Sequence, residues 1–205
     1  MSLKTLQKFG GFSIIFGAFL IMAYAISFNL FLPVRDETAD FAARVSNSNW
    51  IWICMIAFIG VIFIVFGFTA IYSKIYEKSG WIGFIGYISI SLAYILQIAS
   101  LTWEVFIYPV LVSNESTIHI IRDETLLRSP LVSIFLTTFA VIIALGVLIF
   151  SIALLRSSEF YKVGTILFLI GALLYAVGGI FIGVIGVIMF AAGSFILGFN
   201  LIKGK

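Results

Sequence analysis

Four polar side chains recur at helical spacing within one apolar stretch of this 205-residue chain: Gln97, Ser100, Glu104 and Tyr108. Residues three or four positions apart lie on one face of an α-helix, so these four form a stripe. Glu104 is the only charged residue inside a segment expected to cross a membrane, rather than at its flanks. Because burying an ionisable group in hydrocarbon is costly, such a residue is a candidate functional group.

Aromatic side chains lie next to this stripe, and the length of the helix indicates how deep Glu104 lies in the membrane. Glu104 follows Trp81, where the helix is expected to begin, by 23 residues. That length is about 35 Å of helix and places Glu104 near the outer membrane interface. We expect an outward-facing pocket for a small amphipathic ligand, lined by Glu104, Gln97, Trp103, Tyr94, Tyr108 and Ser100. Glu104 would bind a cationic or hydroxylated head group. A polar seam between neighbouring helices and simple interfacial anchoring remain as alternatives.

The sequence carries no signature of catalysis, of metal binding or of nucleotide binding. The single histidine, His119, excludes a haem with two histidine ligands within the chain. Glu115 and Asp123 are the only acids near His119, so we interpret it as an exposed loop residue rather than a metal ligand. Cys54 is the single cysteine, which excludes an internal disulfide. We therefore expect no catalytic residue, no metal, no cofactor and no enzymatic activity, because an acid–base pair or an activated nucleophile is missing.

The composition indicates an integral membrane protein. Apolar residues make up 62% of the chain and charged residues 10%, with a mean hydropathy of +1.22. A soluble domain has about 25% charged residues, so this chain could not cover a water-exposed surface. The long continuous apolar runs predict helices that cross a bilayer. No basic cluster is long enough for a nucleic-acid backbone, and membrane lipids are the expected partners.

We predict an all-α fold, a polytopic transmembrane bundle of six helices in a single domain over residues 1–205. The expected helices are residues 9–33, 50–72, 81–108, 131–155, 163–179 and 183–202. The apolar stretch 163–202 would form about 60 Å of helix, twice the hydrocarbon core, so we expect a tight turn near Gly178 and Gly179. Ala23-Tyr24-Ala25 resembles a signal-peptide cleavage site, but the apolar run continues to Val34 and predicts a retained first helix.

Two connections are longer than the others, residues 34–49 and 109–130. Each could hold a short helix along the membrane surface, with Thr38 capping the first, or could be an ordinary loop packed on the helix ends. Asn114-Glu115-Ser116 in the second matches the glycosylation acceptor pattern, and the sequence leaves its modification open.

Basic residues alternate in density between the connections and predict an orientation. One side carries eight: Lys4, Lys8, Lys74, Lys78, Arg156, Lys162, Lys203 and Lys205. The other carries four: Arg35, Arg44, Arg122 and Arg128. Because cytoplasmic loops are enriched in Lys and Arg, we expect both termini in the cytoplasm and the protein in the plasma membrane.

Three segments share a pattern that indicates an internal repeat. Each odd-numbered helix begins with a lysine, carries a glycine eight or nine residues later and then a tyrosine. The glycines are Gly17, Gly86 and Gly171, and the tyrosines are Tyr24, Tyr94 and Tyr175. We interpret the pattern as three helical hairpins in parallel repeat. Chance alignment of apolar, glycine-rich helices is the alternative.

The layout is similar to that of uncharacterised six-helix membrane proteins of bacteria and archaea. The residues behind this resemblance are Arg44 and Trp50 entering the second helix, Tyr72-Ser73-Lys74 leaving it, and Leu155-Arg156-Ser157 leaving the fourth. The resemblance implies inner termini and two longer outer loops, and it implies no activity.

These patterns favour a non-enzymatic membrane protein that binds or helps to move a small amphipathic, lipid-like ligand. One alternative is a structural accessory subunit of a larger membrane complex, with glycine faces as its contacts. A small secondary transporter is a second alternative, although such proteins commonly use broken helices and a midplane site. The sequence leaves open the ligand's identity and whether the chain forms a homo-oligomer.

Overall fold

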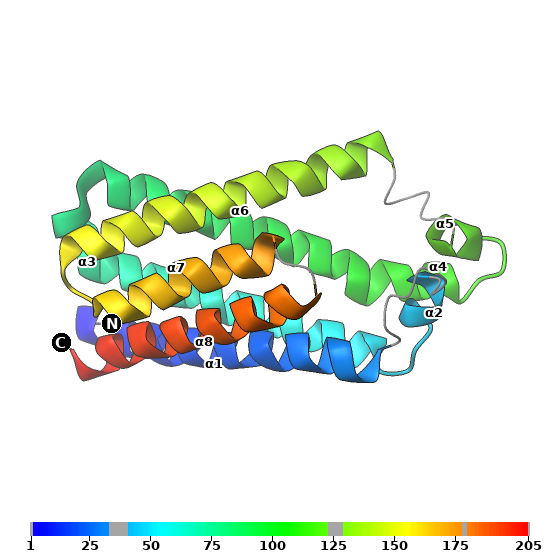
Figure 1. Cartoon of the computed structure of the whole chain (residues 1–205), viewed down its shortest axis with the longest axis horizontal. Coiled ribbons are helices and arrows are strands. Elements are labelled where there is room, and N and C mark those ends of the chain that lie inside the picture. The colour runs from blue at the N-terminus through cyan, green and yellow to red at the C-terminus, as the bar shows by residue number, and fades with distance from the viewer. Residues whose placement is uncertain (1, 33–40, 123–128, 178–179, 205) are drawn as a thin grey trace.

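The computed structural model describes residues 2–32, 41–122, 129–177 and 180–204, without the side chains of 177–181. Long helices lie side by side along one axis, with three short helices gathered at one end and both termini at the other (Figure 1). The elements are α1 (Leu3–Phe31), α2 (Phe41–Val45), α3 (Trp50–Thr102), η1 (Trp103–Ile107, a π-helix), α4 (Tyr108–Val112), α5 (Ile118–Arg122), α6 (Pro130–Ser157), α7 (Lys162–Val177) and α8 (Ile180–Lys203). No strand occurs among these described residues.

Four of these segments are long and apolar enough to cross a bilayer. They are Leu3–Phe31, Trp50–Val112, Pro130–Ser157 and Ile182–Lys203. The prediction of an all-helical bundle with several membrane-spanning helices is confirmed to this extent. The α7 helix has 16 residues, or about 24 Å, and is shorter than the roughly 20 residues that a full crossing needs.

The α3 helix is folded back on itself at one residue. Gly80 has φ +52° and ψ −146°, a conformation that residues with a side chain rarely adopt, and it separates two antiparallel halves. Their contacts are close, since the hydroxyls of Thr69 and Tyr87 lie 3.1 Å apart. The rings of Tyr72 and Tyr87 stack with centroids 4.6 Å apart. The expected connection over residues 73–80 is therefore wrong: 73–79 are helical, and Gly80 alone makes the turn. The expected count of six separate helices is not confirmed.

The two longer connections contain the short helices α2 and α5. Ala42 and Val45 of α2 and Ile121 of α5 are buried against the ends of the long helices. The sequence left open a short surface helix or a loop packed on the helix ends. The structure combines the two, because short helices are present and they pack on the helix ends. Thr38 lies outside the described residues. The predicted turn near Gly178 falls where α7 ends and α8 begins, at Val177 and Ile180.

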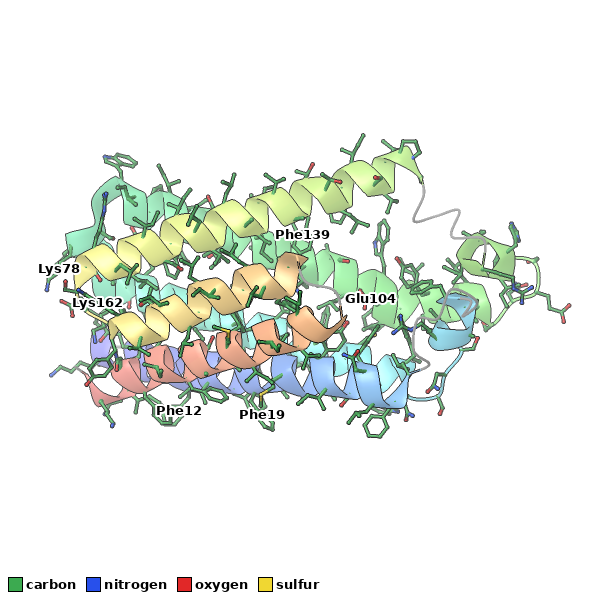
Figure 2. All side chains as sticks on the ribbon, viewed as in Figure 1. Phe12, Phe19, Lys78, Glu104, Phe139 and Lys162 are labelled. Carbon is green, nitrogen blue, oxygen red and sulfur yellow. The ribbon has the colours of Figure 1, made fainter. Side chains whose placement is uncertain are left out.

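The opposite end of the bundle carries basic side chains, among them Lys78 and Lys162 (Figure 2). Lys78 forms an ion pair with Glu159, which lies in the connection between α6 and α7. The ammonium of Lys74 lies 5.1 Å from the centroid of the Phe160 ring. These contacts join the turn of α3 to the α6–α7 connection.

Candidate functional site

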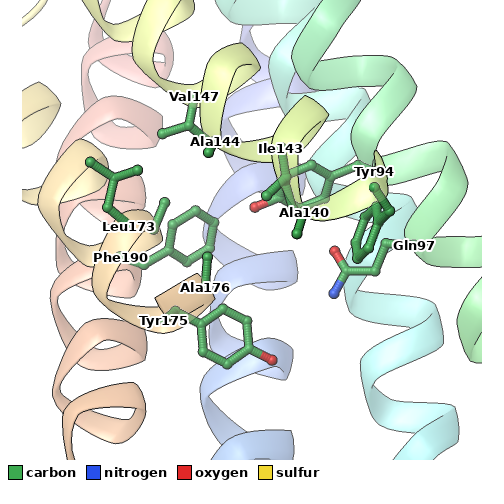
Figure 3. Close-up of a pocket in the computed structure, with 12 residues that line it drawn as sticks. Tyr94, Gln97, Ala140, Ile143, Ala144, Val147, Leu173, Tyr175, Ala176 and Phe190 are labelled. Carbon is green, nitrogen blue, oxygen red and sulfur yellow. The ribbon is translucent and has the colours of Figure 1, made fainter. Parts of the chain in front are cut away.

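A cavity of about 200 Å³ lies between the second half of α3 and helices α6, α7 and α8. Three polar side chains reach it: Tyr94 and Gln97 from α3, and Tyr175 from α7 (Figure 3). The rest of the wall is apolar and consists of Phe139, Ala140, Ile143, Ala144, Val147, Ala172, Leu173, Ala176 and Phe190. Two of the six expected site residues, Tyr94 and Gln97, line this cavity.

The short length of α7 and the small side chains on the cavity wall explain why this cavity exists. The α6 helix has 28 residues, or about 42 Å, whereas α7 has 16 and ends beside the cavity. The first part of α6 consequently extends past α7, and Leu131 and Ile134 there are 79% and 64% exposed. Where α6 and α7 face each other, both helices carry alanines, such as Ala144 and Ala172. Short side chains on both walls leave a gap that larger ones would fill.

Glu104 lies one element further along, in the π-helical turn η1, and does not line the cavity. In this turn the N–H of Tyr108 donates to the carbonyl of Trp103, five residues back. In the same pattern the carbonyl of Glu104 would pair with residue 109, which is Pro109 and has no N–H. The indole N–H of Trp50 donates to this carbonyl instead, at 2.8 Å. Such π-turns are frequent at functional sites.

The Glu104 carboxylate has few partners. Its Oε2 accepts a weak hydrogen bond from the Cys54 thiol at 3.5 Å. It also interacts electrostatically with the phenolic groups of Tyr24, Tyr108 and Tyr175. Among the described residues, no Lys, Arg or His forms an ion pair with it. The partners of this carboxylate among the described residues are therefore the Cys54 thiol and, by electrostatic coupling, phenolic groups.

The other expected site residues take packing roles. The Trp103 ring stacks on Phe135 of α6, with centroids 6.4 Å apart. Tyr108 is 6% exposed and packs edge-on against Phe41 of α2. Ser100 is half-buried and does not line the cavity. The six residues therefore do not form one pocket.

The sequence assigned no site role to Tyr175, which is coupled to both the cavity and Glu104. Tyr175 lines the cavity and interacts electrostatically with Tyr94 and with Glu104. Tyr24 of α1 interacts with both Tyr175 and Glu104. The repeat pattern contained a partial signal for this, because a tyrosine follows the repeated glycine in each of the three segments, at Tyr24, Tyr94 and Tyr175. Cys54 had no comparable signal.

The described residues contain no group of three or more His, Cys, Asp or Glu side chains that could hold a metal ion. His119 is exposed on α5. What the site offers is one carboxylate, hydroxyls, an amide and an apolar cavity, which are groups suited to binding an amphipathic molecule.

Comparisons of the chain with protein-family models, with curated proteins and with solved structures find no match.

Proposed function

We propose that this chain is a non-enzymatic integral membrane protein that binds, or helps to move, a small amphipathic ligand. The observation that carries the proposal is the cavity of about 200 Å³ with apolar walls and three polar groups. An engineered apolar cavity of about 150 Å³ binds benzene, so this space suits a somewhat larger organic group. The hydroxyls of Tyr94 and Tyr175 and the amide of Gln97 would orient the ligand.

We also propose that the chain crosses the membrane six times, as three hairpins in parallel repeat. Counting the halves of α3 separately gives the hairpins α1 with the first half, the second half with α6, and α7 with α8. The repeated glycines support this scheme, because each meets the partner backbone of its own hairpin. A Cβ on Gly17 would lie 2.7 Å from the Gly60 carbonyl oxygen, and one on Gly86 would lie 2.7 Å from the Phe150 nitrogen. On Gly171 it would lie 2.2 Å from the Phe190 nitrogen.

The proposed orientation has both termini in the cytoplasm, in a plasma membrane, with the cavity opening toward the outer leaflet. The support is the shared position of the termini and of the basic residues Lys78 and Lys162 at one end of the bundle. Cytoplasmic loops are enriched in such residues. Membrane lipids would then be the immediate partners of the apolar outer surface.

A role as an accessory subunit, held by glycine faces, receives less support. Gly193 and Gly198 of α8 are the glycines that such a face would use. A Cβ on Gly198 would lie 2.7 Å from the Gly11 carbonyl oxygen, and one on Gly193 would lie 2.3 Å from the Phe168 nitrogen. Both glycines are therefore occupied by helices of the same chain.

Filling the cavity tests the proposed function. Ala144→Phe places a ring in the cavity, whereas Leu145→Phe changes a neighbouring side chain that is 51% exposed on the outer surface. The purified protein in dodecyl maltoside is titrated with benzene-sized amphipathic compounds, and its melting temperature is recorded. We expect stabilisation in the parent and in Leu145→Phe and none in Ala144→Phe. Equal stabilisation of the two variants would contradict the proposal.

A further inference from the structure

Resting on the ligand-binding function proposed above, we propose that the ligand is a lipophilic organic cation. Its apolar body fills the cavity beside Tyr94 and Tyr175, and its positive charge is neutralised by the Glu104 carboxylate. The ligand class follows from the electrostatics around Glu104, from the path between the cavity and this carboxylate, and from the charge of the adjoining connections.

The first step is the charge of Glu104. Its described side-chain hydrogen bond comes from the Cys54 thiol, which is a weak donor and carries no positive charge. Arg44, a cation at the same end of the bundle, lies over the Phe28 ring at 4.6 Å. A carboxylate in an apolar membrane segment needs a proton or a cation to offset the loss of hydration. A cationic ligand supplies that charge.

The second step is the path from the cavity to the carboxylate. Gln97 and Glu104 are seven residues apart in one continuous helical segment, about 10 Å along its axis, and Glu104 lies in the π-turn η1. Tyr175 lines the cavity and is also electrostatically coupled to Glu104. A ligand whose charged end lies about 10 Å from its apolar body can reach both places.

The third step is selectivity among charges. The groups electrostatically coupled to Glu104 are the phenols of Tyr24, Tyr108 and Tyr175 and the Cys54 thiol, none of which carries a positive charge. The connecting segments 34–49 and 109–130 carry six acidic residues, Asp36, Glu37, Asp40, Glu115, Asp123 and Glu124, against the four arginines named above. By sequence their net charge is 4 − 6 = −2, which favours the approach of cations over that of anions on the side of the membrane that these segments face. An anionic head group would meet Glu104 without a neutralising partner.

Three probes of one shape test the charge requirement. The 4-phenylbutyltrimethylammonium ion, (5,5-dimethylhexyl)benzene and 4-phenylbutane-1-sulfonate share a phenylbutyl body and differ in carrying a positive, a neutral or a negative head. Binding of each is measured with the full-length protein in dodecyl maltoside, for the parent, Glu104→Gln, Glu115→Gln and Ala144→Phe. Glu115 is an exposed acid of the same end and serves as the matched control.

We expect the parent to bind the cation tightest and the sulfonate least. Glu104→Gln should weaken cation binding by about tenfold, the scale of a lost charge-assisted contact, and leave binding of the neutral probe unchanged. Retained binding of the neutral probe shows that Glu104→Gln is folded. Equal affinity of the parent for the cation and the neutral probe, or full cation binding by Glu104→Gln, would overturn the cation inference while the cavity still binds. If the parent binds none of the probes, the ligand-binding function itself fails.

Discussion

The indole N–H of Trp50 donates a 2.8 Å hydrogen bond to the backbone carbonyl of Glu104, 54 residues later in the chain. The bond joins the first residue of α3 to the π-turn that follows its second half. The Glu104 carbonyl has no backbone partner within the π-turn, because the residue that would donate to it is Pro109, which has no N–H. Trp50 therefore fixes the position of the backbone that carries the carboxylate of the proposed site.

Trp50→Phe should destabilise the protein by about 1–3 kcal/mol, the cost of leaving a buried carbonyl without a partner. Trp52→Phe is the matched control, because the Trp52 side chain is 72% exposed on the outer surface while Trp50 is 1% exposed. Reversible unfolding in mixed detergent micelles measures both changes. A loss of equal size in the two variants would show that the hydrogen bond to Glu104 contributes nothing particular.

Pro109→Ala should reduce the dependence of stability on Trp50. Alanine restores an N–H at position 109, and this group can donate to the Glu104 carbonyl within the helix. The cost of Trp50→Phe should then shrink by about 1 kcal/mol in the Pro109→Ala background, which a double-mutant cycle measures directly. Additive effects of the two substitutions would mean that Pro109 does not free this carbonyl.

The class of fold could be predicted because it depends on composition. Runs of apolar residues long enough to cross a bilayer are visible without knowing any contact, and so is the turn near Gly178 that length alone requires. The extent of α3 could not be predicted in this way. The segment Ser73–Lys78 is polar and resembles a loop, but nothing in its residues opposes a helix that projects beyond the apolar run. A single glycine then suffices to reverse the chain.

The candidate site stays a prediction, and the structure brings only some of its residues together. Tyr94 and Gln97 are three residues apart, and both line the cavity. Spacing within one helix cannot reveal which other helix ends early, and it is the short α7 that leaves the cavity open. The contact between Cys54 and Glu104 joins residues 50 positions apart and depends on tertiary packing. The π-turn also rotates the residues after Thr102 relative to the stripe expected for a regular helix.

The ion pair between Lys78 and Glu159 should make stability fall slightly in acid. The hydrogen bond from Lys78 lowers the pKa of the Glu159 carboxyl from its ordinary value of 4.5. Because the folded state favours the ionised form, this contribution is complete above the ordinary pKa and is lost as pH falls through the lowered one. The pair is largely solvent-exposed, so its size should be about 0.5 kcal/mol or less.

The pH effect is measured as the melting temperature between neutral pH and pH 3 for the parent, Glu159→Gln and Glu77→Gln. Glu77 accepts a hydrogen bond from the Tyr76 hydroxyl and has no described contact with Lys78, which makes it a suitable control. We expect the acid-dependent loss to be smaller in Glu159→Gln than in Glu77→Gln. Identical pH profiles for the two variants would contradict a role for the ion pair.

Gly80→Ala should destabilise the hairpin formed by the two halves of α3. No atom lies within 4 Å of the position that a Cβ would take, so the effect is conformational rather than steric. At φ +52° and ψ −146° an alanine is strained by about 1–3 kcal/mol, and the strain favours extending α3 as one continuous helix. Ser79→Ala, one residue earlier in regular helix, should cost much less.

Two measurements separate strain from loss of the turn. Unfolding in mixed micelles gives the free energy. Cysteines introduced at positions 69 and 87 report the antiparallel contact through a bifunctional thiol reagent long enough to replace the Tyr87 ring, whose hydroxyl lies 3.1 Å from that of Thr69. We expect slower cross-linking in Gly80→Ala than in Ser79→Ala, both in a Cys54→Ser background. Equal stability together with equal cross-linking would mean that the backbone at position 80 accommodates a side chain and that the reversal of α3 does not depend on glycine.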